Sequence, residues 1–294
     1  MIAIGKGQDM KYLFIILLIV FNFQAVTYLT AQSSSDGFGS QMQIILAGLA
    51  IAESLGLEFV YSPIGACEHN YNQDPNYIKN LNEFVGLSNF FKIMNDFPHN
   101  KRHKINSLPS IRYEDGILNI LDHNALYIVN RNINLWKKVK DKYRKIYLAT
   151  PKPQLKAFDL KKKNVAVHIR RKNIKDNRET LLPDRYYFRI MGLILAKYSN
   201  VVFHIYSQSD PNICINNANT GNFGDYKKFT EQRKCDIVFH LDESIEETFH
   251  GMVMADALIT CDSALSCMAA RVSEGDIYYH KFFCSPMPGW KVFI

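Results

Sequence analysis

The chain has 294 residues, of which 47% are hydrophobic and 21% charged, a composition that excludes a disordered or fibrous protein and suits one large domain or two modest ones. The formal net charge is +7, and its basic residues gather at 137–145 and 152–178, which favours an anionic ligand such as a nucleotide, an acidic polymer or a membrane surface. Nucleic acid has no support as a partner, because the sequence has no zinc-finger spacing, arginine-rich helix or aromatic nucleic-acid-binding signature.

The amino terminus carries Lys6 and Lys11 ahead of an apolar run at residues 12–23. This run is shorter than the roughly 20 residues of a membrane helix and is similar to the core of a signal peptide. No small-x-small cleavage site follows it. We therefore expect residues 1–24 to be an uncleaved signal anchor in the secretory pathway, holding a lumenal catalytic domain on the Golgi or ER membrane. The alternative is a cytoplasmic protein whose first strand is very apolar.

Residues 25–150 are predicted to form an α/β domain that opens as a Rossmann fold does. A strand at 25–31, a glycine-containing turn at 33–41 and a helix at 42–55 lead to a second strand at 58–62. The glycines let the backbone approach a ligand at the amino end of the helix, or they make a tight turn and nothing more. Their spacing is not GxGxxG, so a dinucleotide site is poorly supported.

The loop after the second strand carries three groups suited to proton chemistry, Glu68, His69 and Asp74, although each is more often a surface or capping residue. Two prolines stiffen residues 150–154, where the domain boundary is predicted. Between these points the pattern predicts helices at 75–87 and 136–145, a surface loop at 97–110, and strands at 111–113 and 125–129.

Residues 151–294 are predicted to form a second Rossmann-like domain, because alternating strands and helices imply a parallel sheet covered on both faces. The polar segment at 208–234 is predicted to be an irregular loop. Strands are expected at 165–169, 201–206, 236–240, 257–260 and 277–279, and helices at 184–198, 245–255 and 264–272.

Polar groups follow the strands of this second domain, where sheets of this kind bind ligands. The strand at 165–169 ends in Arg170 and Arg171, whose charged forks of donors suit a diphosphate; the alternative is a strand that runs into a solvated basic loop. Ser263 and Ser266 stand at the start of a helix, where hydroxyls and free N–H groups favour phosphate, although serine there is also an ordinary cap. The other candidate donor-binding residues at strand ends are Ser207, Asp242 and Asp262.

Several signatures are absent from the sequence. It has no Asp-x-Asp pair, so no metal is expected, and positive side chains would have to neutralise a leaving diphosphate. Its six cysteines include no CxxC pair, so a structural zinc site is not expected, while disulfides are permitted but not required. There is no P-loop and no GxSxG elbow. No cofactor is expected.

Three motifs carry a resemblance to a known family. They are Gly37-Phe38-Gly39-Ser40-Gln41-Met42, His168-Ile169-Arg170-Arg171, and the stretch MADALITCDSALS at 254–266. Their order and spacing resemble those of the fucosyltransferase superfamily, which includes α1,2- and α1,6-fucosyltransferases, the nodulation fucosyltransferase and protein O-fucosyltransferases. The chain looks like a compact member, similar to short forms from algae and their large viruses. The resemblance implies a two-domain, glycosyltransferase-B-like fold, no metal, and inversion at the anomeric carbon of the sugar.

The resemblance also implies roles for individual residues. Arg170 and Arg171 would bind the donor diphosphate, with His168 supporting their loop. Ser263 to Ser266 would approach the phosphate or the nucleoside, and the donor sugar or diphosphate would face Gly37, Phe38, Gly39 and Gln41. Two positions depart from the family pattern: Asn173 stands near the place of an aspartate, and Ser40 replaces an asparagine. These departures concern the donor sugar more than the nucleotide.

The sequence thus predicts a metal-independent inverting glycosyltransferase that moves a sugar, fucose from GDP-fucose first, to a hydroxyl of a glycan or glycoprotein acceptor. Arg170 and Arg171 would stabilise the leaving diphosphate, and Asp74 or Glu68 would serve as the base. The alternatives are another nucleotide sugar, such as UDP-xylose, and a non-catalytic carbohydrate-binding protein on the same scaffold. An NAD-dependent enzyme would need a fingerprint that the chain lacks.

Overall fold

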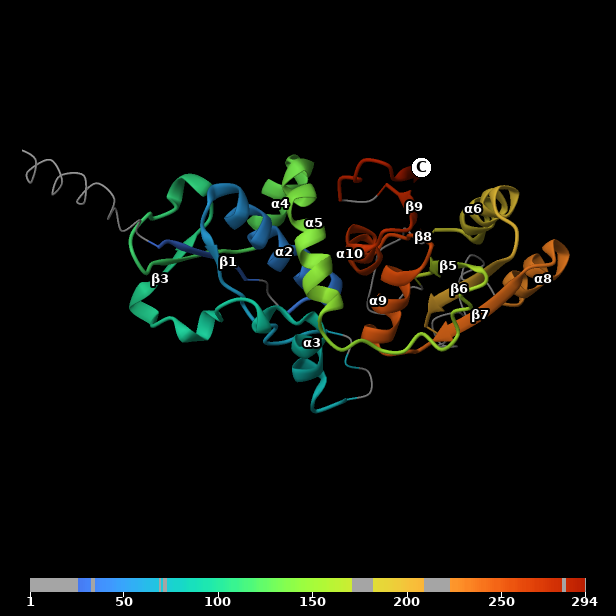
Figure 1. Ribbon diagram of the computed structural model, residues 1–294, viewed down its shortest axis with the longest axis horizontal. Coiled ribbons are helices and arrows are strands. Elements are labelled where there is room, and N and C mark those ends of the chain that lie inside the picture. Colours follow the sequence, from blue (N-terminus) through green and yellow to red (C-terminus); the bar gives the residue numbers. More distant parts are fainter. Residues whose placement is uncertain are drawn as a thin grey trace, which may run out of the picture.

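The computed structural model describes residues 26–32, 35–68, 70, 73–170, 182–208, 223–281 and 284–293. They form two parallel β-sheets, each with its own helices, arranged one after the other along the long axis of the molecule (Figure 1). This confirms the prediction of an α/β protein with two Rossmann-like domains. The apolar run at 12–23 lies outside the described residues.

The first sheet has four parallel strands in the order β2-β1-β4-β3. Its main covering helix, α2, ends at Gly56, which adopts the left-handed conformation with φ +67°. Although α2 is long and apolar enough to cross a membrane, most of it is buried inside the molecule, so it is a core helix. The elements of this domain are β1 (Tyr28–Ala31), α2 (Phe38–Leu55), β2 (Glu58–Phe59), α3 (Tyr77–Val85), β3 (Arg102–Ile105), β4 (Leu118–Leu121), α4 (Asn124–Arg131) and α5 (Ile133–Leu148).

Three of the predictions for residues 97–129 are wrong. The expected loop at 97–110 contains β3, an edge strand whose basic and polar residues gave no apolar alternation. The expected strand at 125–129 belongs to α4, because the carboxylate of Asp122 accepts a hydrogen bond from Asn124 N–H at 2.9 Å and starts a helix there. Residues 111–113 form no strand, and the chain joins the sheet later, at β4.

The second sheet has six parallel strands in the order β10-β9-β8-β5-β6-β7. The loop expected at 208–234 instead includes α8, whose hydrophilic sequence buries only Tyr226 and Thr230, and the last strand, β10, was not predicted. The elements are β5 (Lys163–His168), α6 (Asp184–Lys197), β6 (Val201–Ser207), α8 (Gly224–Arg233), β7 (Asp236–Leu241), α9 (Ile245–Met254), β8 (Ala257–Ile259), α10 (Ala264–Val272), β9 (Asp276–His280) and β10 (Lys291–Phe293).

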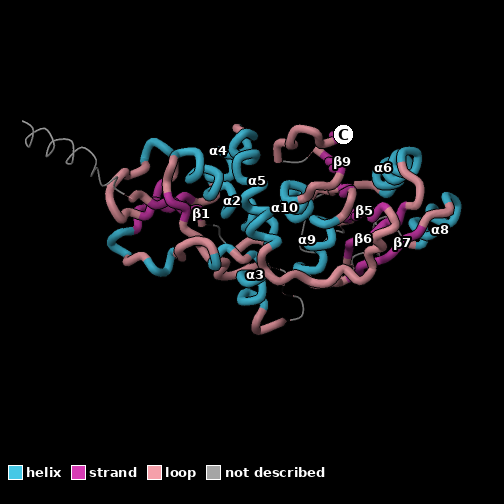
Figure 2. The backbone as a smooth tube through the Cα atoms, in the orientation of Figure 1, coloured by secondary structure: helices cyan, strands magenta, loops and turns pink. Residues whose placement is uncertain are grey.

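The two domains share a packed interface rather than only a linker. The connector between α5 and β5 runs along the molecule without regular structure (Figure 2), and the predicted boundary at residue 150 falls within it. Helices α2, α5 and α10 lie between the two sheets (Figure 1), and one buried apolar cluster includes residues of both domains. The described chain therefore has two sheets joined by one shared apolar cluster, and each sheet has a further cluster of its own.

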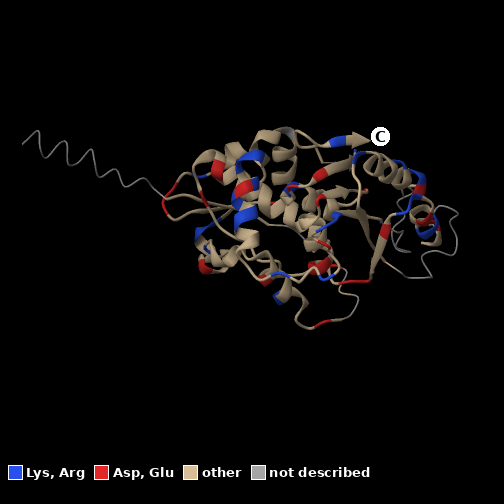
Figure 3. Ribbon diagram, turned by 45° about the vertical axis from the view of Figure 1, so that its right-hand side comes forward, with Lys and Arg blue, Asp and Glu red and all other residues tan. Residues whose placement is uncertain are grey.

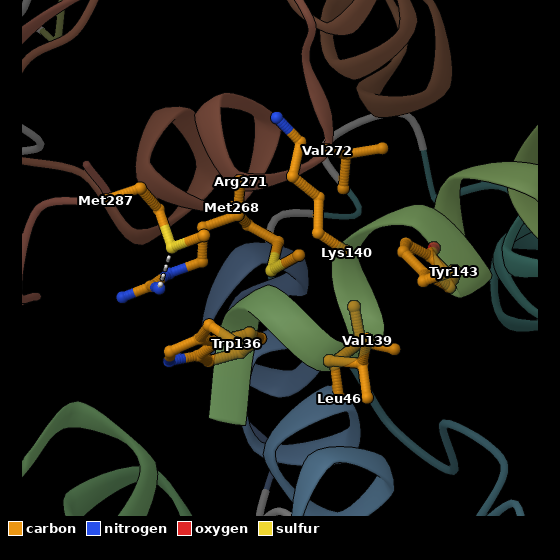
Figure 4. A pocket seen from close by; sticks show the side chains of 9 residues that line it. All are labelled: Leu46, Trp136, Val139, Lys140, Tyr143, Met268, Arg271, Val272 and Met287. Carbon is orange, nitrogen blue, oxygen red and sulfur yellow. Dashed lines mark hydrogen bonds between the residues drawn. The ribbon is translucent and has the colours of Figure 1, made fainter. Parts of the chain in front are cut away.

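Arg271 of α10 lies at the centre of this interface, beside Trp136 and Met287 (Figure 4). Its guanidinium is 4.1 Å from the centroid of the Trp136 ring and donates to Asn130 Oδ1 and to Ser285 O, both at 3.2 Å. Asn130 belongs to the first domain and Ser285 to the segment after β9. Arg271 therefore ties α10 and the carboxyl-terminal segment to the first domain.

Candidate functional site

Strand β5 lies at the point where the second sheet reverses its order. It pairs with β6 on one side and with β8 on the other, and the chain continues from β5 to β6 but from β8 to β9, so the connections leave these two neighbouring strands in opposite directions. Open α/β sheets bind ligands outside the carboxyl ends of the strands at such a point. Arg170 follows β5 there and Asp262 follows β8, and Arg170 Nη1 donates to the backbone oxygen of Asp262 at 3.3 Å. The half-buried arginine therefore occupies the expected ligand position.

His168 supports this strand end from inside the protein. Its Nδ1 lies 3.2 Å from Cys261 Sγ, and both side chains are buried. Burial, and then the charge of Arg170, lower the pKa of His168 to about 3, while burial raises the pKa of Cys261 to about 12. Both groups are therefore neutral near pH 7, and their contact fixes the ends of β5 and β8 against each other.

The carboxylate of Asp262 lies close enough to Arg170 to be influenced by its charge. Its Oδ1 lies 3.3 Å from His280 Nε2, and the Tyr186 ring meets the His280 ring edge to face with centroids 5.3 Å apart. Burial raises the pKa of Asp262, and the charges of His280 and Arg170 oppose that rise. His280 was not among the residues predicted for the site. It is the last residue of β9 and directly follows the predicted strand at 277–279, and this position at a strand end is the signal that could have found it.

The serines at the start of α10 shape the turn. Ser263 Oγ accepts a hydrogen bond from Leu265 N–H at 3.2 Å, which makes Ser263 the cap of the helix. Ser266 is fully buried, and its hydroxyl donates to the backbone oxygens of Cys261 and Ser263, both at 3.4 Å. The hydroxyl of Ser266 therefore holds the turn together from within.

The glycine turn of the first domain meets this same turn. A Cβ atom on Gly39 would lie 2.3 Å from Leu265 N and 2.6 Å from Ala264 C, so only glycine allows the first turn of α2 to touch the first turn of α10. Gln43 of α2 adds a hydrogen bond from Nε2 to Ala264 O at 3.3 Å. The two motifs, more than 200 residues apart, are thus brought into direct backbone contact.

Phe38 and Gln41 have internal partners. Phe38 is buried, and its ring packs edge to face on Phe249 of α9 with centroids 5.5 Å apart. Gln41 Nε2 donates to Asp36 O at 2.6 Å and to Ala66 O at 2.8 Å, which ties the start of α2 to the loop after β2. In the described structure these side chains hold the turn that Gly37 begins.

The junction of α2 and α10 favours an anion. Each helix has unpaired N–H groups and a partial positive charge at its amino end, and here two such ends touch beside the guanidinium of Arg170. Like partial charges repel, so a negative group at this junction would stabilise it. Asp262 supplies one carboxylate, which is already shared with His280.

The basic run at 137–145 lies elsewhere. Figure 3 shows Lys and Arg along α5, on the outside of the molecule. There Lys142 pairs with Glu53, and Arg144 Nε lies 3.2 Å from Glu274 Oε1. This positive face is therefore solvated and partly neutralised by ion pairs.

Two more predicted residues lie along the same edge of the sheet. Ser207, at the end of β6, donates its hydroxyl to Ile169 O at 2.8 Å, next to Arg170. Asp242, which follows β7, is exposed and adopts φ +58°, and its N–H donates to Ser207 O at 3.1 Å. The strand ends β5, β6 and β7 are thus linked one to the next. Arg171 and Asn173 lie outside the described residues.

The candidate bases, Glu68 and Asp74, lie in the first domain, in the segment between β2 and α3. Glu68 is exposed, whereas Asp74 lies just before α3 and accepts hydrogen bonds from Asn76 N–H at 2.8 Å and from Asn80 Nδ2 at 3.2 Å. Burial raises the pKa of Glu246 on α9, and the charges of Glu247 and Asp74 raise it further. Asp74 thus lies close enough to the second domain to influence a carboxyl group there. Glu246 was not predicted, because two glutamates at the start of a helix are the ordinary pattern.

A polar cavity of about 270 Å³ opens in the first domain beside the start of α2. None of the described residues that line it has a charged side chain. Its walls come from the end of β1, the first turn of α2 and the loop after β2, at the carboxyl edge of the first sheet. The lining residues are Gln32, Ser35, Gln41, Ser62, Pro63, Gly65 and Ala66.

Neither a model of a known family nor a curated protein sequence matches the chain. Among solved structures, it is similar to POFUT1 in complex with GDP, with a TM-score of 0.49 and 10% identity, covering 86% of this chain and 96% of that one. A second structure, POFUT1 in complex with GDP-fucose, gives a TM-score of 0.45 and 10% identity, with 87% and 97% covered. A mutant of Arabidopsis thaliana FUT1 in complex with GDP gives 0.42 and 10%, with 97% and 76% covered. At this identity and TM-score the likeness assigns no function, which has to come from the residues of this chain.

Proposed function

We propose that the chain is a metal-independent inverting glycosyltransferase in which Arg170 binds the diphosphate of a nucleotide-sugar donor. One observation carries the proposal: the three motifs of the sequence resemblance meet at the switch point of the second sheet. Gly39 contacts Leu265, and Arg170 donates to Asp262 O. Because the motifs resemble those of fucosyltransferases, GDP-fucose is the donor that we propose first.

In the proposed reaction, an acceptor hydroxyl attacks the anomeric carbon as the bond from that carbon to the diphosphate oxygen breaks. The negative charge that develops on the diphosphate is stabilised by Arg170 and by the amino ends of α2 and α10, with Arg171 as a second guanidinium. A carboxylate takes the proton of the hydroxyl. Asp74 and Glu68 are the candidates from the sequence. Glu246 is a further candidate, because burial and then the charges of Glu247 and Asp74 raise the pKa of its carboxyl group.

The polar cavity beside α2 is proposed to hold a sugar ring. Its uncharged amide, hydroxyl and backbone groups suit the hydroxyls of a neutral carbohydrate, and its volume of about 270 Å³ is enough for one ring. Gln41 lines the cavity from the helix turn that also carries Gly39. The acceptor would be a glycan or glycoprotein. Membrane anchoring and a place in the secretory pathway are separate proposals that rest on the apolar run at 12–23.

The test compares Arg170→Ala with Arg185→Ala, which removes an exposed arginine from α6. Thermal shift with GDP, UDP and their sugars in EDTA would identify the nucleotide, since a ligand that binds only the folded state raises the melting temperature. Turnover of the preferred donor should fall by roughly two to three orders of magnitude in Arg170→Ala, as for loss of a preorganised donor to a developing oxyanion, and stay unchanged in Arg185→Ala. Near-wild-type turnover in Arg170→Ala would refute the mechanism, and no shift with any nucleotide would favour a carbohydrate-binding protein.

A further inference from the structure

Two buried cysteines of the second domain lie against each other at the interface with the first domain. Cys267 is on α10 and Cys284 is in the segment that follows β9, and both belong to the apolar cluster that the two domains share. The two thiols are within hydrogen-bond reach of each other, and both are free in this structure. They are therefore a pair of neighbouring thiols rather than two separate small hydrophobic residues.

Gln43 of α2 holds Cys284 beside α10. Its Nε2 lies 3.2 Å from Cys284 Sγ and 3.3 Å from Ala264 O, so one amide group bridges the cysteine and the first turn of the helix. Ala264 and Cys267 are three positions apart and share one face of α10, and a helical carbonyl oxygen points toward the following turn. The bridge therefore places Cys284 Sγ at the helix face that carries the Cys267 thiol.

Arg271 makes the next contact with the same segment, one turn further along α10. Its Nη2 donates to Ser285 O at 3.2 Å, and the Tyr279 hydroxyl donates to Cys284 O at 2.7 Å. The contacts of α10 with this segment thus lie on both sides of Cys267. Because the backbone around Cys284 is fixed in this way, the two thiols face each other through the fold and not through a chance side-chain rotation.

The segment that carries Cys284 has no helix to hold it in place among its described residues. It joins β9 to β10, which pair in parallel, and parallel neighbours are usually connected by a crossover helix. The described part of residues 281–290 contains a turn but is otherwise irregular. Its position therefore depends on the side chains that attach it to α10 and to the first domain, and a covalent bond to α10 would strengthen that attachment.

We propose that Cys267 and Cys284 form a disulfide when the chain folds in the presence of a disulfide oxidant such as oxidised glutathione, and that this bridge holds the segment after β9 on α10. One cysteine thiolate attacks the oxidant, which releases one reduced glutathione and leaves a mixed disulfide. The second thiolate attacks the cysteine sulfur of the mixed disulfide and releases the other glutathione. The two thiols thus lose two protons and two electrons, and the oxidant is reduced to two thiols. Because both cysteines are buried in the folded protein, the exchange takes place before the interface closes.

The test is refolding of the full chain from urea in a glutathione redox buffer, followed by alkylation of free thiols and mass spectrometry of the peptides. Digestion with trypsin and chymotrypsin separates Cys267 from Cys261, because Leu265 lies between them. We expect one cross-linked pair of peptides that contains Cys267 and Cys284 and that separates on reduction. Alkylation of both cysteines, or a bond from either to a different cysteine, would overturn the proposal.

Thermal melting tests the stabilising role of the bridge. The chain refolded with oxidised glutathione should melt roughly 5 °C above the chain refolded with reduced glutathione, because a bridge across a loop of this length restricts the unfolded chain. Cys267→Ser should abolish this difference, whereas the matched control Cys235→Ser, which removes a half-buried thiol that contacts Thr230 O, should retain it. Equal melting temperatures for the two wild-type preparations would overturn the stabilising role. If Cys267→Ser did not fold, the peptides of the wild type would still decide whether the bridge forms.

The inference does not rest on the proposed function, since neither measurement requires a nucleotide or a sugar.

Discussion

Replacing Gly39 by alanine tests whether the contact between α2 and α10 holds the site together. The new Cβ would lie 2.3 Å from Leu265 N and 2.5 Å from Leu265 Cα, far inside van der Waals contact. Both atoms are backbone, so no side-chain rotation can relieve the overlap, and the two helix ends must separate. Overpacking of this kind costs about 1–3 kcal/mol, while alanine in a helix gains up to about 1 kcal/mol over glycine. We expect a net loss of about 1–2 kcal/mol in the free energy of unfolding.

Urea unfolding and thermal melting measure this loss, which corresponds to a melting temperature about 2–3 °C lower for a chain of this size. GDP binding should weaken as well, because the amino ends of α2 and α10 no longer converge. The matched control is Gly192→Ala in α6, where the new Cβ meets nothing within 4 Å and stability should rise by up to about 1 kcal/mol. If Gly39→Ala were as stable as the wild type and bound GDP equally well, the contact would not be essential to the site.

Two further predictions concern buried polar groups. Burial lowers the pKa values of His168 and His204 to about 3 and that of His250 to about 4, from an ordinary value of 6.5. Below pH 6.5 the unfolded chain therefore binds protons at these histidines, whereas the folded chain binds them only at a pH near the lowered pKa values. The free energy of unfolding is then highest above pH 6.5 and falls as the pH decreases, by roughly 2 kcal/mol for each histidine at pH 5. Urea titrations at several pH values measure this fall, and a free energy of unfolding that stays constant from pH 7 to 5 would contradict the prediction. The second variant is Tyr206→Phe, which should leave the free energy of unfolding unchanged or raise it by up to about 1 kcal/mol, because the buried Tyr206 hydroxyl has no hydrogen-bond partner among the described residues. A loss above about 1 kcal/mol in the same urea titration would show that the hydroxyl is bonded.

The second domain was largely predictable because its strands are short apolar runs and its helices have clear starts. The strand before Arg170 is buried and rich in β-branched residues, and Ser263 marks the start of α10 by the pattern of a helix cap. The first domain was harder. There β3 is an edge strand with basic side chains. The run from Ala125 to Val129 is apolar enough for a strand, and only the hydrogen bond from Asn124 N–H to the Asp122 carboxylate marks the start of a helix before it.

The site was predictable only in part. Parallel topology places Arg170, Ser207, Asp242 and Asp262 at one edge, and this follows from their positions after strands. The sequence does not show which residues of the first domain lie close to which residues of the second. The contact of Gly39 with Leu265 depends on how α2 and α10 cross, so a glycine needed for tight packing looks the same as a glycine needed for a turn.

The apolar cluster shared by the two domains has a consequence for how the protein folds. The same apolar cluster takes in Leu29 and Leu49 of the first domain and Leu258 and Ile277 of the second, and Arg271 bonds across it. Unfolding either half would expose the apolar face of the other to water, at a cost that grows with the area uncovered. The two sheets are therefore expected to unfold together as one cooperative unit. For the same reason, neither half is expected to be stable when it is expressed without the other.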